Sequence, residues 1–387
     1  MRAFRTFALP ALALIGCTAN GGVADGNAAA QSEPQDTGAQ PFRVQPVGQF
    51  SEPWAMAFLP GGRQALITEK HGALKLWTVG GAAIDVSGVP QVDHGGQGGL
   101  GDVILHPEFA TNNIIYLSWA EAGEGDTRGA AVGRGRLVVD GNAARLEGLQ
   151  VIWRQQPKVT GRGHYAHRLL FSPDGRHLFI SSGDRQKFDP AQDMNANLGK
   201  ILRLNPDGSV PADNPFADRG GVAAQIWVLG LRNPLGFAFA PDGRFWEIEM
   251  GPEGGDELNL VQRGANYGYP IVSDGDHYDG RPIPDHSTRP EFAAPKVTWT
   301  PVISPGNMIV YTGDLFPQWR GDALVPGLSS EALIHVDLDG DAAREAGRWP
   351  MGARIREVEQ APDGSLYLLE DSREGRGGRL LHLTPAG

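Results

Sequence analysis

A short stretch in the middle of the chain concentrates side chains that can exchange protons. Residues 161–185 read GRGHYAHRLLFSPDGRHLFISSGDR, in which two apolar runs flank a Pro-Asp-Gly turn, the pattern of a β-hairpin. Because a hairpin brings its open ends together, we expect one cluster of five polar side chains there: His164, His167, Arg168, Asp184 and Arg185. An imidazole beside a carboxylate is the arrangement of a general base, and a surface ion pair is the alternative. The glycines before His164 favour this histidine as the base.

Two further segments supply positive charge. WVLGLRNPLGFAF (227–239) places Arg232 and Asn233 between an apolar strand and a proline turn, where they should project from a loop. In GARIREVEQ, Arg354 and Arg356 are two residues apart and therefore share one face of a strand. Two guanidinium groups on one face favour an anionic ligand or water between them. Arginines at such positions can also close a turn or pair on the surface, so both interpretations stay open.

An acidic, glycine-rich segment indicates a cation site. EMGPEGGDELN (249–259) exposes the backbone carbonyls of its Gly-Pro-Glu-Gly-Gly run and carries Glu253, Asp256 and Glu257. Oxygen ligands on a flexible loop suit Ca²⁺ rather than Zn²⁺, although the spacing is not that of an EF-hand. SDGDHYDG (273–280) adds three aspartates nearby. By composition alone, a solvated acidic turn is at least as good an interpretation.

The elements that must position these side chains repeat along the chain. A proline turn followed by a β-rich run recurs with prolines at positions 60, 107, 173, 241 and 362, and the long last gap leaves room for a divergent unit around residues 307–328. Six such units, without sustained helical periodicity, predict an all-β, six-bladed β-propeller over residues 42–387. FRVQPV near the start and RLLHLT near the end are expected to pair and close the ring.

Composition and the first residues indicate where the protein works. The chain has 387 residues, 41% of them hydrophobic, and a net charge of −11, which is typical of a globular protein and argues against phosphate-driven binding of nucleic acid. Arg2 and Arg5 precede an apolar stretch that ends at Cys17 in LIGC, which resembles a bacterial lipobox. We therefore expect a lipoprotein-type signal peptide over residues 1–17 and a flexible linker over residues 18–41. The expected location is the periplasm or, through a lipid anchor on Cys17, the outer membrane; a plain secretory peptide is the alternative.

Taken in order, several segments resemble one known family. GQGGLGDVILHPEF, GRGHYAHRLLFSPDG with SSGDR, GLRNPLGFAF, GPEGGDELNLVQRGANYGYP and ARIREV follow one another as in the soluble pyrroloquinoline-quinone (PQQ)-dependent aldose sugar dehydrogenases of the glucose/sorbosone dehydrogenase family. The resemblance covers nearly all of residues 42–387 and implies a propeller that uses PQQ and Ca²⁺. The implied reaction oxidises an aldose at its anomeric carbon to a lactone, with hydride transfer to the quinone, and the electrons then pass to an external acceptor.

The resemblance also carries roles to single positions. In the implied catalytic group, a histidine base is oriented by an aspartate: the residues are His164, Asp184, Arg232 and Gln97. The residues implied to contact the quinone are Arg232, Asn233, Arg354 and Arg356, the last two at its carboxylates. The implied Ca²⁺ ligands are the carbonyls of Gly251 and Pro252 at the cofactor, and Glu257 and Tyr267 at a second, structural site.

The chain departs from the family pattern at four positions. Met250 stands where a glutamine or histidine precedes Gly-Pro, and Leu235 where some members have a glutamine. Ser329 lies near the place of a cofactor-binding lysine, and His167 occupies a place usually filled by glycine. Two other functions stay open beside the dehydrogenase: a non-catalytic surface propeller that binds a glycan or a protein, and a Ca²⁺-dependent lactonase.

Overall fold

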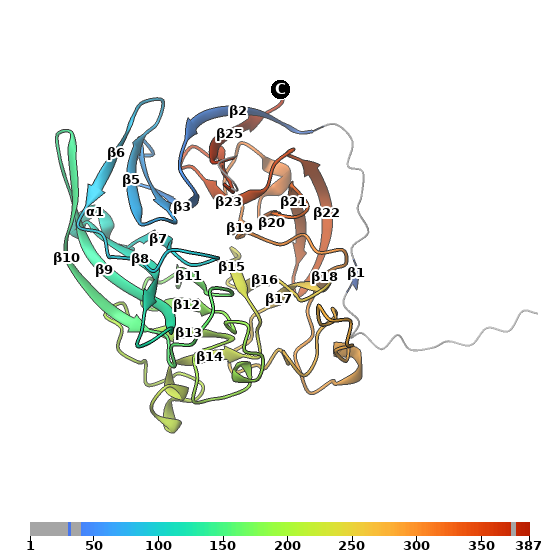
Figure 1. Ribbon diagram of the computed structural model, residues 1–387. Helices are drawn as coiled ribbons and strands as arrows, with labels where there is room; N and C mark the ends of the chain where they lie inside the picture. Colours follow the sequence, from blue (N-terminus) through green and yellow to red (C-terminus); the bar gives the residue numbers. More distant parts are fainter. Residues whose placement is uncertain (1–29, 32–39, 373–376) are drawn as a thin grey trace, which may run out of the picture.

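The computed structural model describes residues 30–31, 40–372 and 377–387, and it shows a ring of six four-stranded blades around a central channel (Figure 1). Neighbouring strands within each blade are antiparallel. The outermost strands of the first two blades also pair in parallel, so these blades share one eight-stranded sheet. The prediction of an all-β, six-bladed propeller is confirmed.

The blades follow the chain from the innermost strand outward. Blade 1 consists of β3 (Pro53–Phe58), β4 (Gln64–Glu69), β5 (Ala73–Thr78) and β6 (Ala83–Ser87). Blade 2 consists of β7 (Leu100–Leu105), β8 (Ile114–Ala122), β9 (Arg128–Asp140) and β10 (Ala143–Arg154). Blade 3 consists of β11 (Ala166–Phe171), β12 (Leu178–Ser182), β13 (Lys200–Leu204) and β14 (Ile226–Leu229).

The second half of the ring repeats this order. Blade 4 consists of β15 (Pro234–Phe239), β16 (Phe245–Glu249), β17 (Asp256–Leu260) and β18 (Val297–Trp299). Blade 5 consists of β19 (Ile309–Val310), β20 (Ala323–Pro326), β21 (Ala332–Asp339) and β22 (Ala342–Pro350). Blade 6 consists of β23 (Ile355–Gln360), β24 (Leu366–Glu370), β25 (Arg379–Pro385) and β2 (Phe42–Gln49). The divergent unit predicted around residues 307–328 thus supplies β19 and β20.

The two ends of the described propeller meet in blade 6. Strand β2 pairs antiparallel with β25, with Val44 opposite Leu383, so the start of the chain completes the last blade (Figure 1). The predicted closure of the ring is confirmed, and it ties the first blade to the last through main-chain hydrogen bonds. Strand β1 (Ala30–Gln31), inside the predicted linker, pairs with β18. The predicted signal peptide and Cys17 lie outside the described residues.

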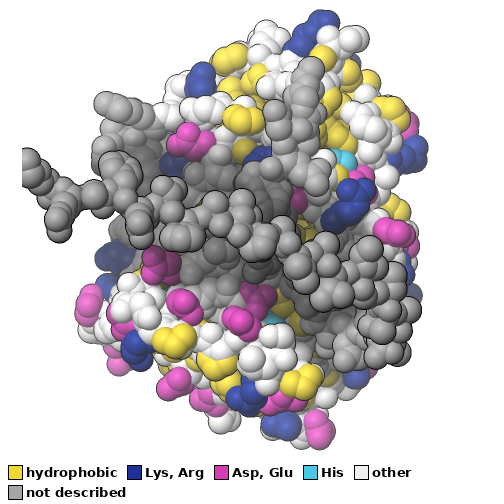
Figure 2. Space-filling model, turned by 90° about the vertical axis from the view of Figure 1, so that its right-hand side faces the viewer, with side chains coloured by type: hydrophobic (Ala, Val, Ile, Leu, Met, Phe, Trp, Pro, Cys, Tyr) yellow, Lys and Arg dark blue, Asp and Glu magenta, His cyan; other side chains and the backbone are white. Residues whose placement is uncertain are grey.

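Helices are short in this structure. The described elements are α1 (Phe109–Asn112) and the 3₁₀ turns η1 (Asp189–Ala191), η2 (Ala217–Arg219), η3 (Ala223–Gln225), η4 (His286–Thr288) and η5 (Pro317–Trp319). Within residues 40–372 and 377–387, none is long and apolar enough to cross a membrane. On the face seen in Figure 2, charged side chains of both signs are intermixed with isolated hydrophobic ones, as expected where apolar side chains are used mainly between blades.

The core lies between the blades, because each sheet packs against a neighbour on both faces. The second strand of most blades is therefore almost wholly buried, as in LFISS of β12 and LYLLE of β24. Large rings fill the spaces, among them Trp119, Trp246 and Trp299, each no more than 2% exposed. This packing leaves the loops at the ends of the strands to carry the function.

Arg168 on β11 joins blade 3 to all five other blades across the central channel. Its guanidinium stacks 3.9 Å from the ring of Trp54, lies 2.8 Å from a carboxylate oxygen of Glu357, and donates to the carbonyl of Leu235 at 2.9 Å. It also donates to the Gly306 carbonyl at 2.7 Å and lies 3.5 Å from Asp102. A charge buried in this way is satisfied only when the ring is closed, so Arg168 fixes the inner strands beneath the site loops.

Candidate active site

The hairpin of β11 and β12 brings His164 to Asp184, as the sequence predicts. Nδ1 of His164 lies 2.7 Å from Oδ1 of Asp184, and that carboxylate also accepts the backbone N–H groups of Gln186 (2.9 Å) and Phe188 (3.3 Å). The carboxylate can only accept, so Nδ1 carries the proton and Nε2 is left with its lone pair. Burial, together with the charge of Arg232, lowers the pKa of His164 despite the hydrogen bond to Asp184. The ring is therefore held neutral and oriented, as a general base must be.

The backbone around this pair is strained. Of the ten described non-glycine residues with positive φ, six lie between residues 164 and 188: His164, Ala166, His167, Arg185, Gln186 and Phe188. Arg185 stabilises this conformation, since its guanidinium donates to the carbonyls of Gly163 (2.8 Å) and Gly161 (2.6 Å) and stacks 3.7 Å from the ring of Tyr165. Such strain persists only where the surroundings enforce it, and it is concentrated here at the predicted site.

The prediction that His167 and Arg168 join the His164–Asp184 cluster is wrong. A bulge between Ala166 and Leu169 interrupts the pairing of β11 with β12 and turns these side chains elsewhere. His167 stacks on Trp54, and its Nδ1 lies 2.7 Å from Oγ of Ser118. Arg168 points into the channel, as described above.

Arg232 and Asn233 lie between β14 and β15, and a buried carboxylate shapes their loop. Oε2 of Glu249 accepts the backbone N–H groups of Arg232 (2.5 Å) and Asn233 (3.1 Å). The Arg232 guanidinium donates to the carbonyls of Met250 (3.0 Å) and Gly251 and to the Tyr278 hydroxyl (3.2 Å). The backbone N–H of Asp184 donates to the Arg232 carbonyl at 2.7 Å. Arg232 therefore belongs to the same cluster as the candidate base, as predicted.

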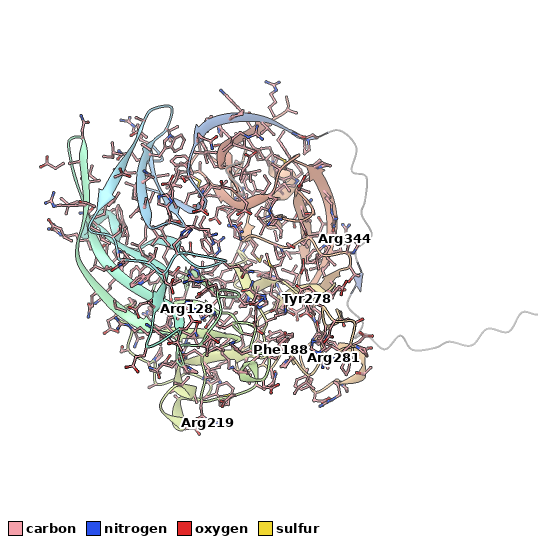
Figure 3. All side chains as sticks on the ribbon, in the orientation of Figure 1. Arg128, Phe188, Arg219, Tyr278, Arg281 and Arg344 are labelled. Carbon is pink, nitrogen blue, oxygen red and sulfur yellow. The ribbon has the colours of Figure 1, made fainter. Side chains whose placement is uncertain are left out.

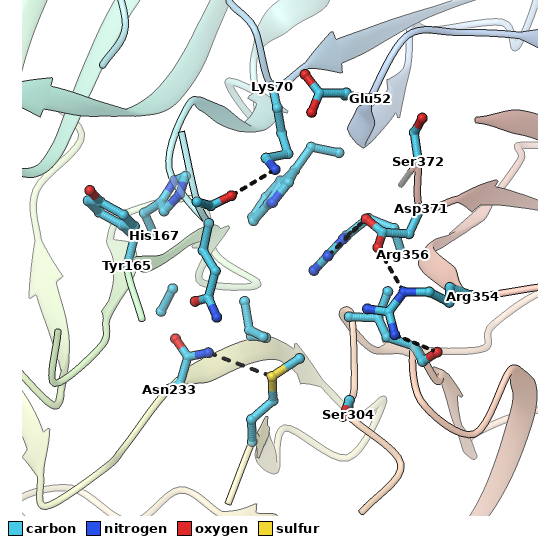
Figure 4. Close-up of a pocket in the computed structure, with 17 residues that line it drawn as sticks. Glu52, Lys70, Tyr165, His167, Asn233, Ser304, Arg354, Arg356, Asp371 and Ser372 are labelled. Atoms are coloured by element: carbon cyan, nitrogen blue, oxygen red, sulfur yellow. Dashed lines mark hydrogen bonds and ion pairs between the residues drawn. The ribbon is translucent and has the colours of Figure 1, made fainter. Parts of the chain in front are cut away.

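The predicted residues line two adjoining cavities. The larger, about 420 Å³, contains Gln97, Asn233, Arg354 and Arg356 (Figure 4). The smaller, about 220 Å³, contains His164, Asp184, Arg232 and Pro252. Gln97 connects the two, because its Oε1 accepts the backbone N–H of His164 at 2.7 Å. Met250 and Leu235, which depart from the family pattern, form an apolar part of the wall of the larger cavity.

Arg354 and Arg356 project into the larger cavity from the start of blade 6, as their spacing predicts. The anion between them is a side chain of the protein: Nε of Arg354 lies 3.0 Å from Asp371 Oδ2, and Nη2 of Arg356 lies 3.0 Å from Oδ1. Burial alone would raise the pKa of Asp371, but Arg356 and Arg354 lower it. Both guanidiniums line the cavity, where an anionic ligand can contact them.

Sequence reasoning missed Lys70. It follows β4 in blade 1 and lines the larger cavity from the side opposite Arg354, with Nζ 3.1 Å from the Gly96 carbonyl (Figure 4). Ser329, near the place of the family's lysine, bonds instead to Ser304 and to the Val302 carbonyl. The chain thus supplies a lysine from another blade, which no local motif could indicate.

The Gly251 segment has a donor set that fits Ca²⁺. The backbone N–H of Gly251 donates to Asp256 Oδ1 at 2.8 Å, while the Gly251 carbonyl already accepts a cationic side chain, Arg232. A Cβ on Gly251 would lie 2.1 Å from the Gly255 carbonyl oxygen, so this tight loop requires glycine. Pro252 lines the smaller cavity. The Met250 and Gly251 carbonyls face the Arg232 guanidinium and are hard oxygen ligands of the kind that Ca²⁺ prefers.

Comparison with known proteins shows which family has this sequence and fold. Residues 50–382 match the family described as Glucose / Sorbosone dehydrogenase. The chain belongs to this family. It is 39% identical over 345 residues to the aldose sugar dehydrogenase YliI of Escherichia coli strain K12, which covers 87% of this chain and 91% of that protein.

Solved structures of the family superpose on most of the chain. The apo form of the soluble aldose sugar dehydrogenase of Escherichia coli has a TM-score of 0.82 at 38% identity, over 89% of this chain and 99% of that one. The PQQ-bound aldose sugar dehydrogenase of Streptomyces coelicolor has a TM-score of 0.70 at 25% identity, over 89% and 98% of the two chains.

In this member of the glucose/sorbosone dehydrogenase family, both residues predicted for a structural Ca²⁺ are buried beside His286. The Tyr267 hydroxyl donates to the Leu260 carbonyl at 2.6 Å, and the Tyr267 carbonyl lies 2.9 Å from Nε2 of His286. Nδ1 of His286 lies 3.5 Å from Asp274 and 3.9 Å from Glu257. Burial would lower the pKa of His286, but Glu257 and Asp274 raise it to about 9. His286 therefore lies beside both predicted ligands.

Proposed function

We propose that the protein is a PQQ- and Ca²⁺-dependent aldose sugar dehydrogenase, which oxidises the anomeric carbon of an aldose to a lactone and passes the electrons to an external acceptor. The observation that carries this proposal is the neutral, oriented His164 at a small cavity that adjoins a larger one lined by cations. The family membership supports it. When bound, the quinone and its Ca²⁺ would supply the hydride acceptor.

His164 removes the proton in this reaction. The anomeric hydroxyl gives its proton to Nε2, while the hydrogen on the same carbon leaves with its electron pair and a C=O bond forms. Asp184 holds Nδ1–H at 2.7 Å and stabilises the imidazolium that results. Arg232, whose guanidinium reaches the same cavity, stabilises negative charge that develops opposite the base.

The larger cavity is the place for the quinone, a planar molecule with several carboxylates. Arg354 and Arg356 would bind carboxylates from one side and Lys70 from the other, since all three line the cavity. Asn233 and Gln97 would contact the ring system between them. The Gly251 and Pro252 carbonyls would hold the Ca²⁺.

Reconstitution tests the proposal. Purified apoprotein is given PQQ and Ca²⁺ and assayed with aldoses and a redox dye, in parallel with His164→Ala. We expect the parent protein to reduce the dye only when both PQQ and Ca²⁺ are present. His164→Ala should still bind PQQ but should not reduce the dye. Failure of the parent protein to bind PQQ, even with Ca²⁺, would favour the non-catalytic propeller. Lactone hydrolysis without PQQ would favour the lactonase.

We also propose that the protein is exported and anchored through a lipid on Cys17. The support for this proposal is the sequence alone, namely LIGC and the preceding arginines, since these residues lie outside those that the structure describes. Labelling of cells with radioactive palmitate should mark the protein, and Cys17→Ser should abolish the label. Secretion without label would indicate the plain signal peptide.

A further inference from the structure

Two aromatic side chains are exposed at the smaller cavity. Phe188 is 43% exposed and Tyr278 is 70% exposed. Among the described residues, no other Phe, Tyr or Trp side chain is exposed to this extent. Both line the cavity that contains His164 and Arg232. Apolar surface left in water is unfavourable, and two exposed aromatic rings at one cavity indicate a surface that meets a ligand.

Phe188 is held in place by the same carboxylate that orients the base. Its backbone has φ 61° and ψ −90°, a strained conformation for a bulky residue, and its N–H lies 3.3 Å from Oδ2 of Asp184. The ring packs edge-on against His277, with centroids 5.7 Å apart, and lies 6.4 Å from Tyr269. Strain that leaves a phenyl ring exposed gives no stability, so it indicates a role in binding.

Tyr278 is tied to the catalytic cluster from another segment. Its hydroxyl accepts from Nη2 of Arg232 at 3.2 Å, and its ring centroid lies 5.6 Å from the guanidinium carbon. Figure 3 shows Tyr278 and Phe188 in the same region of the molecule, on segments nearly a hundred residues apart in sequence. The two rings therefore border one cavity, and each is fixed by a residue that the proposed reaction uses.

We propose that Phe188 and Tyr278 form an aromatic clamp that holds the pyranose ring of the substrate over His164. This inference rests on the proposed function and names the class of sugar. The C–H groups of a pyranose are apolar and slightly positive, and they complement the negative face of an aromatic ring. An axial hydroxyl would press a polar group against a ring without a hydrogen-bond partner. The clamp therefore favours pyranoses whose hydroxyls are equatorial, such as glucose and xylose, over galactose and mannose.

Three variants test the clamp. Phe188→Asn removes the ring but keeps a residue that tolerates positive φ, Tyr278→Ala removes the other ring, and Tyr278→Phe keeps the ring without the hydroxyl. Phe188→Asn and Tyr278→Ala should each raise KM for glucose about tenfold and reduce the preference for glucose over galactose. Tyr278→Phe should change KM little. Leu315→Ala, at an exposed apolar residue that does not line this cavity, is the matched control.

A second readout separates this inference from the proposed function. Saturation-transfer NMR on the apoprotein should show enhanced signals of the pyranose C–H protons, which weaken in Phe188→Asn and Tyr278→Ala. Sugar binding that depends on the two rings, without oxidation by the reconstituted protein, would overturn the proposed function and keep the clamp. Oxidation with unchanged KM and unchanged sugar preference in both variants would overturn the clamp and keep the proposed function.

Discussion

Replacing Gly101 with alanine should destabilise the protein strongly, and only because His167 is present. A Cβ at position 101 would lie 1.9 Å from Cε1 and 2.2 Å from Nδ1 of the His167 ring. The ring cannot move away, because it stacks on Trp54 with centroids 5.0 Å apart and its Nδ1 is bonded to Ser118. Overpacking against a fixed, buried ring costs about 3 kcal/mol.

The same substitution should cost less than about 1 kcal/mol once His167 is replaced by glycine. The new methyl group would then meet only Ser118 Oγ, at 3.0 Å. His167→Gly by itself loses a buried ring but relieves the positive φ of 51°, so its net cost should be about 2 kcal/mol. Urea unfolding of the four proteins, followed by tryptophan fluorescence at pH 7, gives a coupling energy of at least about 2 kcal/mol. Equal costs of Gly101→Ala in both backgrounds would refute the reasoning.

The free energy of unfolding measured in these four proteins should also depend on pH when His167 is present. Burial, with Arg168 and Arg185 nearby, lowers the pKa of His167 from 6.5 to about 3. Below pH 6.5 the His167 imidazole is protonated in the unfolded chain but stays neutral in the folded chain. The contribution of neutral His167 to the free energy of unfolding is therefore complete above pH 6.5 and is lost as pH falls toward 3. At pH 5 the loss is about 2 kcal/mol. His167→Gly should lack this component, and an identical loss in parent and variant between pH 7 and pH 5 would contradict it.

Three further outcomes can be checked on the reconstituted protein. His164→Ala should lower the sugar-oxidation rate by about 10² or more. The parent's rate should rise with pH with a midpoint below 6.5, because burial lowers the pKa of His164; a midpoint above 6.5 would contradict this. Lys70→Ala should weaken PQQ binding about tenfold in an absorbance titration, and Lys70→Arg less, whereas equal affinities would remove Lys70 from the cofactor site. Chelation should abolish PQQ binding, and equilibrium dialysis should find two Ca²⁺ per chain; one only would remove the site at Glu257 and Tyr267.

The repeating blades could be predicted from the sequence because each blade depends on local turns and strands. Pro-Asp-Gly turns fix tight reversals, and the apolar runs beside them can only be strands buried on both faces, so their spacing predicts both the blades and the divergent unit at residues 307–328. The pairing of His164 with Asp184 followed from the same rule, since the two ends of one hairpin must meet. The placement of His167 and Arg168 failed because a bulge re-aims side chains and leaves no clear mark in the residue types.

What the sequence by itself determined is therefore whatever lies within one hairpin or one turn: the six blades, the base with its carboxylate, the paired arginines before β24 and the glycine loop at Gly251. Only the tertiary structure decided what comes together from different blades or from the two ends of a long loop. Lys70 faces Arg354 across the larger cavity, His286 stands between Glu257 and the Tyr267 carbonyl, and Phe188 shares the smaller cavity with Tyr278. The physical reason is ring closure, which sets distances between residues far apart in sequence that no local interaction encodes.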